Sequence, residues 1–245
     1  MASKLTKQIV KWLEEYRDNT QCRGVVLGIS GGKDSTTVAM LAKKVWGDNV
    51  VGIMMPNGAQ TDLGDSLAIC DTLRIRSAVV NIGETVAQLI HTVNYGTAFA
   101  NVSQKAITNI PPRIRMTTLY TIAQSMGYRV IGTGNASEAY IGWTTKWGDN
   151  AYDLNPIAGL TCSEVVQVGL ELAKEFGLDE KYIVKKPADG LTGVSDEDNF
   201  GFSYADLDGF INGVMPESAE VAKKIFDMHA ASEHKRSLPY CFQKR

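Results

Sequence analysis

Apolar residues recur along the chain in two alternating patterns. Leu5, Ile9, Leu13 and Tyr16 follow the three- to four-residue spacing of an amphipathic helix. The next segment, 24–29, is a short continuous apolar run, which indicates a strand buried on both faces. The same alternation predicts further strands at 50–55, 78–82 and 129–133, and further helices at 34–46, 62–73, 84–93, 112–126 and 161–176.

Strands that alternate with helices are typical of an α/β fold with a doubly wound parallel sheet flanked by helices. No repeat, low-complexity stretch or Ser/Gly-rich linker divides the sequence, so we expect residues 1–245 to form a single domain. Its C-terminal part, about 204–230, is again helical in pattern. Segments 142–156 and 187–204 are rich in Gly, Asp, Asn and Thr and lack periodicity, which predicts long loops with a functional or mobile role.

Composition and charge narrow the class of protein. The net charge of −2 disfavours a general nucleic-acid binder, which needs a basic surface. Four widely spaced cysteines form no CxxC pair, and the three histidines form no HExxH motif. The first residues contain no apolar signal core, and no apolar run is long enough to cross a bilayer. We therefore expect a cytoplasmic protein with neither nucleic-acid nor membrane partners.

The most informative segment joins the first predicted strand directly to the next helix. It reads Gly28-Ile29-Ser30-Gly31-Gly32-Lys33-Asp34-Ser35. Small residues let the backbone approach an anion, and the amides and dipole of a helix N-terminus favour negative charge. A Walker A loop requires Ser or Thr after the lysine, whereas Asp34 stands there. The segment predicts a phosphate-binding loop of another type.

A second group of polar residues, 132–138, follows the fourth predicted strand and ends in Glu138. Ligands of doubly wound sheets lie at the carboxyl ends of the strands, where the winding order reverses. If the first and fourth strands are neighbours, Asp34 and Glu138 face the same crevice. Two carboxylates beside a polyphosphate suit Mg²⁺, although Glu138 also fits a solvated helix start.

The loop resembles the SGGxDS motif of the N-type ATP pyrophosphatases, which have a Rossmann-like, adenine-nucleotide alpha hydrolase-like fold. Four further segments, in order, make the chain similar to the ammonia-dependent NAD synthetases over residues 5–236. These segments are 113–116, 132–138, 145–156 and 232–236.

The resemblance implies a ligase that amidates deamido-NAD (nicotinic acid adenine dinucleotide) with ammonia, the last step of NAD biosynthesis. The carboxylate is adenylated by ATP with Mg²⁺, and AMP and pyrophosphate are released. The family is a homodimer with the dinucleotide bound across the interface. By matching position, ATP falls on residues 28–35 and Thr133, the metal on Asp34 and Glu138, deamido-NAD on Arg113, Lys146, Asp153, His234 and Lys235, and catalytic roles on Lys33 and Asp149.

The chain departs from the family pattern at three positions. Cys162 stands where a lysine for the ATP phosphates is common, Pro187 where Ser or Thr is common, and Lys33 where Gln is common. We hypothesise that Lys33 supplies the charge missing at position 162, with Lys185 or Lys186 as alternatives.

Other functions stay open at this point. The chain fits a different ATP pyrophosphatase, of the tRNA-thiolating or GMP-synthetase-like kind, or a nucleotide sensor without catalysis. Cys162 is also a candidate nucleophile for glutamine hydrolysis, although no histidine lies near it in the sequence. A chain of this length has no room for a separate glutaminase domain, so ammonia is the expected donor.

Overall fold

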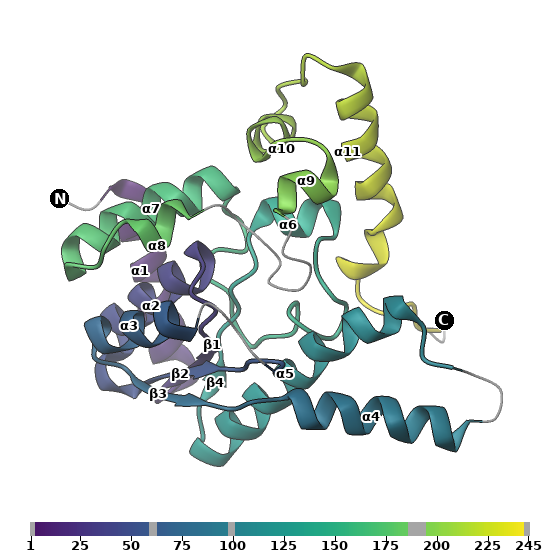
Figure 1. Cartoon of the computed structure of the whole chain (residues 1–245). Coiled ribbons are helices and arrows are strands. Elements are labelled where there is room, and N and C mark those ends of the chain that lie inside the picture. Colours follow the sequence, from purple (N-terminus) through teal and green to yellow (C-terminus); the bar gives the residue numbers. More distant parts are fainter. Residues whose placement is uncertain (1–2, 59–62, 98–100, 186–194, 243–245) are drawn as a thin grey trace.

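A computed structural model describes residues 3–58, 63–97, 101–185 and 195–242 (Figure 1). Short strands alternate with helices along the first half of the chain, and helices dominate the second half. The elements are α1 Lys4–Thr20, β1 Val25–Gly28, α2 Lys33–Trp46, η1 Gly47–Asn49, β2 Val50–Met54, α3 Leu63–Leu73, β3 Arg76–Val79, α4 Gly83–Gly96, α5 Gln104–Met126, β4 Arg129–Val130, α6 Ala136–Ile141, α7 Cys162–Phe176, α8 Lys181–Val184, α9 Asp196–Phe200, α10 Tyr204–Ile211, α11 Ala219–Ala231 and η2 Glu233–Lys235.

The four strands form one parallel sheet in the order β3-β2-β1-β4. Val25 and Val26 of β1 pair with Arg129 and Val130 of β4, while the other edge of β1 pairs with β2. The first and fourth strands are therefore neighbours, which was the condition for Asp34 and Glu138 to face each other. The winding order reverses between β1 and β4, so the β1–α2 loop and the segment after β4 meet at the same end of the sheet.

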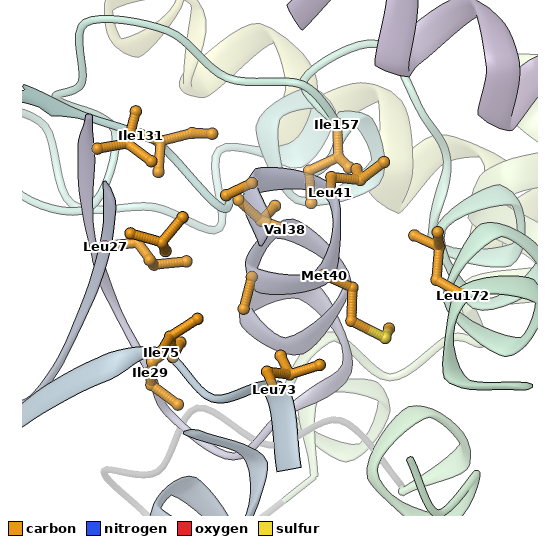
Figure 2. Close-up of a cluster of buried hydrophobic side chains, with 14 of the residues drawn as sticks. Leu27, Ile29, Val38, Met40, Leu41, Leu73, Ile75, Ile131, Ile157 and Leu172 are labelled. Carbon is orange, nitrogen blue, oxygen red and sulfur yellow. The ribbon is translucent and has the colours of Figure 1, made fainter. Parts of the chain in front are cut away.

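Helices cover both faces of the sheet, as the doubly wound prediction requires. Alternate residues of β1 point to opposite sides, so Val25 and Leu27 join the larger core and Val26 joins the smaller one. Figure 2 shows core side chains on both sides of α2, with Leu27 of β1 on one side and Leu172 of α7 on the other. The smaller core lies under α4 and α5. Burial on both faces explains why the strands read as continuous apolar runs.

Two strands differ from their predicted ranges. The third begins at Arg76 rather than 78 and lies at the sheet edge, where all four of its residues are exposed. The fourth contains only two residues, because beyond Val130 the backbone turns to other partners. Ile131 forms an isolated bridge with Leu154, and the Gly132 amide donates to the Leu154 carbonyl at 2.7 Å. Apolar composition indicated the position of each strand, but neither the exposure of the edge strand nor the point where sheet pairing stops.

The largest error concerns α5, which begins at Gln104 rather than at Pro112. Ser103 caps its first turn, and Pro111 and Pro112 lie inside the helix. Each internal proline removes one hydrogen bond and favours a break. Ile110 and Ile114, on either side of the prolines, both pack against the smaller core. Their burial keeps the helix continuous.

The C-terminal helices form a third hydrophobic cluster with α6, beside the sheet (Figure 1). Asp208 of α10 connects this cluster to the N-terminal turns of α6 and α7. It is 5% exposed, and it accepts hydrogen bonds from Ser137 Oγ at 2.5 Å and from the Ser163 amide at 2.8 Å. The predicted loop 187–204 contains α9, which corrects that expectation in part, and residues 186–194 lie outside the described ranges. None of the helices in the described ranges has the length and hydropathy needed to span a membrane.

Close packing of α7 on α2 predicts a strong size limit at Gly169. A Cβ atom there would lie 2.6 Å from Thr37 Oγ1 and 2.9 Å from Ile183 Cγ2. Gly169→Ala should lower the free energy of unfolding by about 1–3 kcal/mol, because overpacking displaces a helix. Gly209→Ala in α10 is the matched control, since its Cβ would meet nothing closer than 3.7 Å. The control should gain about 0.5–1 kcal/mol from helix propensity. Urea unfolding of both variants measures this, and equal effects would contradict the packing argument.

Candidate functional site

The β1–α2 loop is shaped by short side-chain bonds at the carboxyl end of β1. Ser30 and Ser35 hydroxyls lie 3.0 Å apart, and the Gly32 amide donates to Ser30 Oγ at 3.3 Å. Gly31 takes a φ of +80°, a conformation that glycine adopts without strain. Helix α2 starts at Lys33 with no side chain capping its N-terminus. Its first amides and dipole are therefore available to an anion, as the sequence predicts for a phosphate loop.

The two predicted metal carboxylates are brought together across the β1–β4 boundary. Asp34 lies in the first turn of α2, and Glu138 lies in the first turn of α6. Asn135 links them: its side-chain amide donates to Asp34 Oδ1 at 3.0 Å, and its backbone amide donates to Glu138 Oε2 at 3.1 Å. Burial and the neighbouring Asp34 raise the pKa of Glu138 to about 8. In the ligand-free protein Glu138 therefore keeps its proton at neutral pH, and a bound cation would favour its ionised form.

Lys33 supplies positive charge to this pair in the structure. Its side chain is 4% exposed, and Nζ lies 2.7 Å from Asp34 Oδ2 and 5.4 Å from the ring centroid of Tyr204. Burial alone would lower the pKa of Lys33, but Asp34 and Glu138 hold it above its usual range. The lysine is therefore charged at neutral pH, inside the site rather than at its rim.

Cys162 is the first residue of α7, and its thiol lies within electrostatic range of Lys33, Asp34 and Glu138. Burial raises the pKa of its thiol to about 12, with Lys33 acting in the opposite direction. Its backbone amide donates to Ser137 Oγ at 2.9 Å, and the residue is 6% exposed. A thiol that stays protonated is a poor nucleophile. The arrangement disfavours glutamine hydrolysis at Cys162.

Asp149 lies on the loop after α6. Its Oδ1 accepts a hydrogen bond from the Thr145 amide at 2.6 Å. The surrounding protein raises the pKa of Asp149 by desolvation, while Lys235 and Arg115 act to lower it. One carboxylate thus lies within electrostatic range of two cations, a setting suited to a small cation beside an anionic substrate.

Four of the five residues matched to deamido-NAD gather around this loop. Arg113 Nε donates to the Lys146 carbonyl at 3.3 Å, and Lys146 Nζ donates to the His234 carbonyl. Lys235 Nζ donates to the carbonyls of Gly142 and Thr144 at 2.7 and 2.6 Å. The C-terminal segment thus fixes the loop that carries Asp149.

The remaining residues that the sequence analysis singled out lie in other surroundings or outside the described ranges. Asp153 Oδ2 accepts from the Val130 amide at 2.8 Å, and its charge acts on Tyr16 and Tyr120 instead of on the cluster around Lys146. Lys185 pairs with Asp65 at 3.2 Å, on α3. Thr133 lies in the segment between β4 and α6, two residues before Asn135. Lys186 and Pro187 lie outside the described residues.

Sequence reasoning missed several residues of the site. Asn135 was readable, since Asn followed three residues later by Glu is the pattern of a capping box, which α6 has. Asp196 falls in the predicted loop 187–204, but it lies in α9, is 4% exposed and accepts a hydrogen bond from Tyr204 Oη at 2.9 Å. No local pattern indicates that Tyr204 covers Lys33. Arg115 also went unassigned beside Arg113.

The described residues contain no ready-made metal cage, because no three His, Cys, Asp or Glu side chains cluster there. Mg²⁺ commonly takes one or two carboxylates and completes its shell with substrate phosphates and water. Asp34 and Glu138, beside an uncapped helix N-terminus, fit that donor set.

The chain is similar to known proteins over nearly its whole length. The family model described as NAD synthase matches residues 5–239. An NH(3)-dependent NAD(+) synthetase of Carboxydothermus hydrogenoformans is 39% identical, covering 96% of this chain and 95% of the relative. The structure is similar to an NMN synthetase from Francisella tularensis, with a TM-score of 0.88, 32% identity and 98% of both chains covered. It is also similar to an NH3-dependent NAD synthetase from Campylobacter jejuni, with a TM-score of 0.76, 28% identity and 98% of both chains covered. The chain belongs to the NAD synthase family.

Proposed function

We propose that the protein amidates the nicotinate carboxylate of deamido-NAD with ammonia, at the expense of ATP, and releases NAD, AMP and pyrophosphate. The observation that carries the proposal is the meeting of Lys33, Asp34 and Glu138 at the uncapped start of α2. Family membership supports the choice of acceptor and donor.

The first half-reaction brings two anions together, since the carboxylate attacks the α-phosphorus of ATP and pyrophosphate leaves. The 28–35 loop and the α2 N-terminus are placed to bind the phosphates. Lys33 neutralises charge on the leaving pyrophosphate, which is electrostatic catalysis by a preorganised group. Its buried position next to Cys162 supports the hypothesis that it replaces a lysine absent there.

Asp34 and Glu138 are the residues that would hold Mg²⁺, which supplies Lewis-acid polarisation of the phosphates when bound. Asn135 orients both carboxylates through its side-chain and backbone amides. Such outer contacts fix the direction of metal ligands in other proteins.

The second half-reaction requires neutral ammonia to attack the acyl carbon of the adenylate. Asp149 binds ammonium and accepts one proton, so that the amine becomes nucleophilic next to the acyl group. Lys146, Arg113 and Lys235 hold the anionic groups of the acceptor.

The exposed surface of α4 and α5 supports a homodimer. Of the 14 residues of α4 only Val86 is buried, and Leu89 and Tyr95 are 39% and 83% exposed. Figure 1 shows α4 extending beyond the edge of the sheet. A second copy seated there would cover these side chains and lie near Arg113 of α5. Sedimentation should give twice the chain mass of 26.7 kDa at micromolar concentration, and a monomer there would exclude this interface.

Amidation of nicotinic acid mononucleotide is the second candidate. It is favoured by the likeness to the NMN synthetase from Francisella tularensis, which has a higher TM-score than the Campylobacter jejuni NAD synthetase, 0.88 against 0.76. Both reactions adenylate the same carboxylate. They differ in whether an adenylyl group of the acceptor occupies the site.

The test uses the purified protein with ATP, Mg²⁺ and either the dinucleotide or the mononucleotide acid, with ammonium or glutamine as donor. NAD and AMP formed in equal amounts with ammonium alone establish the proposal. A higher kcat/KM for the mononucleotide establishes the second candidate. Absence of AMP with either acceptor refutes both.

Lys33→Gln tests the charge hypothesis. We expect kcat/KM for ATP to fall about 10- to 100-fold, because the loss of one hydrogen bond to a charged group typically changes binding by about that factor. Lys44→Gln, on the same helix and paired with Glu175 near the surface, is the matched control. Unchanged ATP kinetics in Lys33→Gln would leave Lys33 a structural residue.

The raised pKa of Asp149 predicts that the KM for ammonium depends on pH, with an acid limb where Asp149 becomes protonated. Since its pKa is raised, protonation occurs at a pH above the usual aspartate range, and the protonated form cannot hold a cation. The KM for total ammonium should therefore rise as the pH falls, and Asp149→Asn should have a high KM with no such limb. An acid limb that persists in the variant would assign it to another group.

A further inference from the structure

Arg115 is a cation of the site for which the proposed mechanism has not accounted. It projects from α5, and its Nε donates to the carbonyl of Met55 at 3.1 Å. Met55 directly follows β2, so the guanidinium lies at the carboxyl end of the sheet. The side chain is partly buried, and burial lowers the pKa of Arg115 while Asp149 raises it.

Two close approaches of α5 place its Arg115 turn between the end of β1 and the loop that carries Asp149. On one side, a Cβ on Gly28 would lie 3.4 Å from Met55 Cε and 4.0 Å from Leu119, one helical turn after Arg115. On the other side, Pro112, one turn earlier on α5, would lie 3.0 Å from a Cβ on Gly148, the neighbour of Asp149. The adenylated intermediate must span the same interval.

The hydrogen bonds of Arg115 are incomplete within the described part of the chain. The guanidinium has five N–H donors, and the bond to Met55 uses one of them. None of the ion pairs between described residues includes Arg115, although Asp149 is close enough for each to affect the pKa of the other. A partly buried guanidinium whose remaining donors have no partner among the described residues is suited to a phosphate, which it binds through two parallel bonds.

We propose that Arg115 binds the phosphoryl group of the AMP moiety, both in the adenylate and in the departing AMP. This assignment rests on the proposed function for its role in catalysis, but not for the binding itself. Ammonia attacks the acyl carbon, the bond from that carbon to the phosphate oxygen breaks, and its electron pair leaves with AMP. AMP thereby gains one negative charge, which Arg115 neutralises. The attacking nitrogen releases one proton to water, since Asp149 already holds the proton taken from ammonium.

Calorimetric titration with AMP and with adenosine tests the binding directly. In Arg115→Gln the Kd for AMP should rise about 10- to 100-fold, while the Kd for adenosine changes less than about twofold. Arg115→Lys keeps a point charge without the paired donors and should fall between the two. Arg23→Gln, an exposed arginine just before β1, is the control and should bind AMP like the unaltered protein.

Equal losses of AMP and adenosine affinity, or no loss of either, would overturn the proposal. Thermal unfolding of each variant separates misfolding from lost contact, and Arg115→Lys serves if Arg115→Gln does not fold. These titrations need neither acceptor nor ammonium. A protein that discriminates AMP from adenosine through Arg115 yet forms no amide would retain this assignment and lose the proposed function.

Discussion

The parallel pairing of β1 with β4 is the contact on which the site depends. It involves only two residue pairs, yet it brings Asp34 and Glu138 together although about a hundred residues separate them in the chain. The pairing also makes the winding order reverse, which opens a crevice between the helices that follow the two strands. Asn135 completes the junction by holding one carboxylate with its side chain and the other with its backbone.

The charges of the site are balanced within the fold. Two carboxylates close together repel, and burial raises the cost of their ionisation. Lys33 offsets that cost in the ligand-free protein. A polyphosphate that binds with its cation would change this balance. Lys33 would then exchange its ion pair with Asp34 for one with the phosphates.

Much of this arrangement could be predicted from the sequence. Alternating apolar segments indicated the fold class, and Gly28–Ser35 indicated the phosphate loop, because both depend on local patterns. The start of α5 was wrong because tertiary burial of Ile110 and Ile114 outweighs two prolines. The short β4 was missed because its end depends on Leu154, a distant partner. Tyr204 and Asp196 were missed for the same reason, since only the folded chain brings them to Lys33.

The acceptor half of the site depends on the last helical turn of the described chain. Lys235, His234 and Arg236 hold the 142–150 loop and the end of α6 through backbone carbonyls. These residues leave the ribosome after every other part of the site. A nascent chain can thus assemble the 28–35 loop early, whereas the loop that carries Asp149 is fixed only after residues 234–236 have been synthesised.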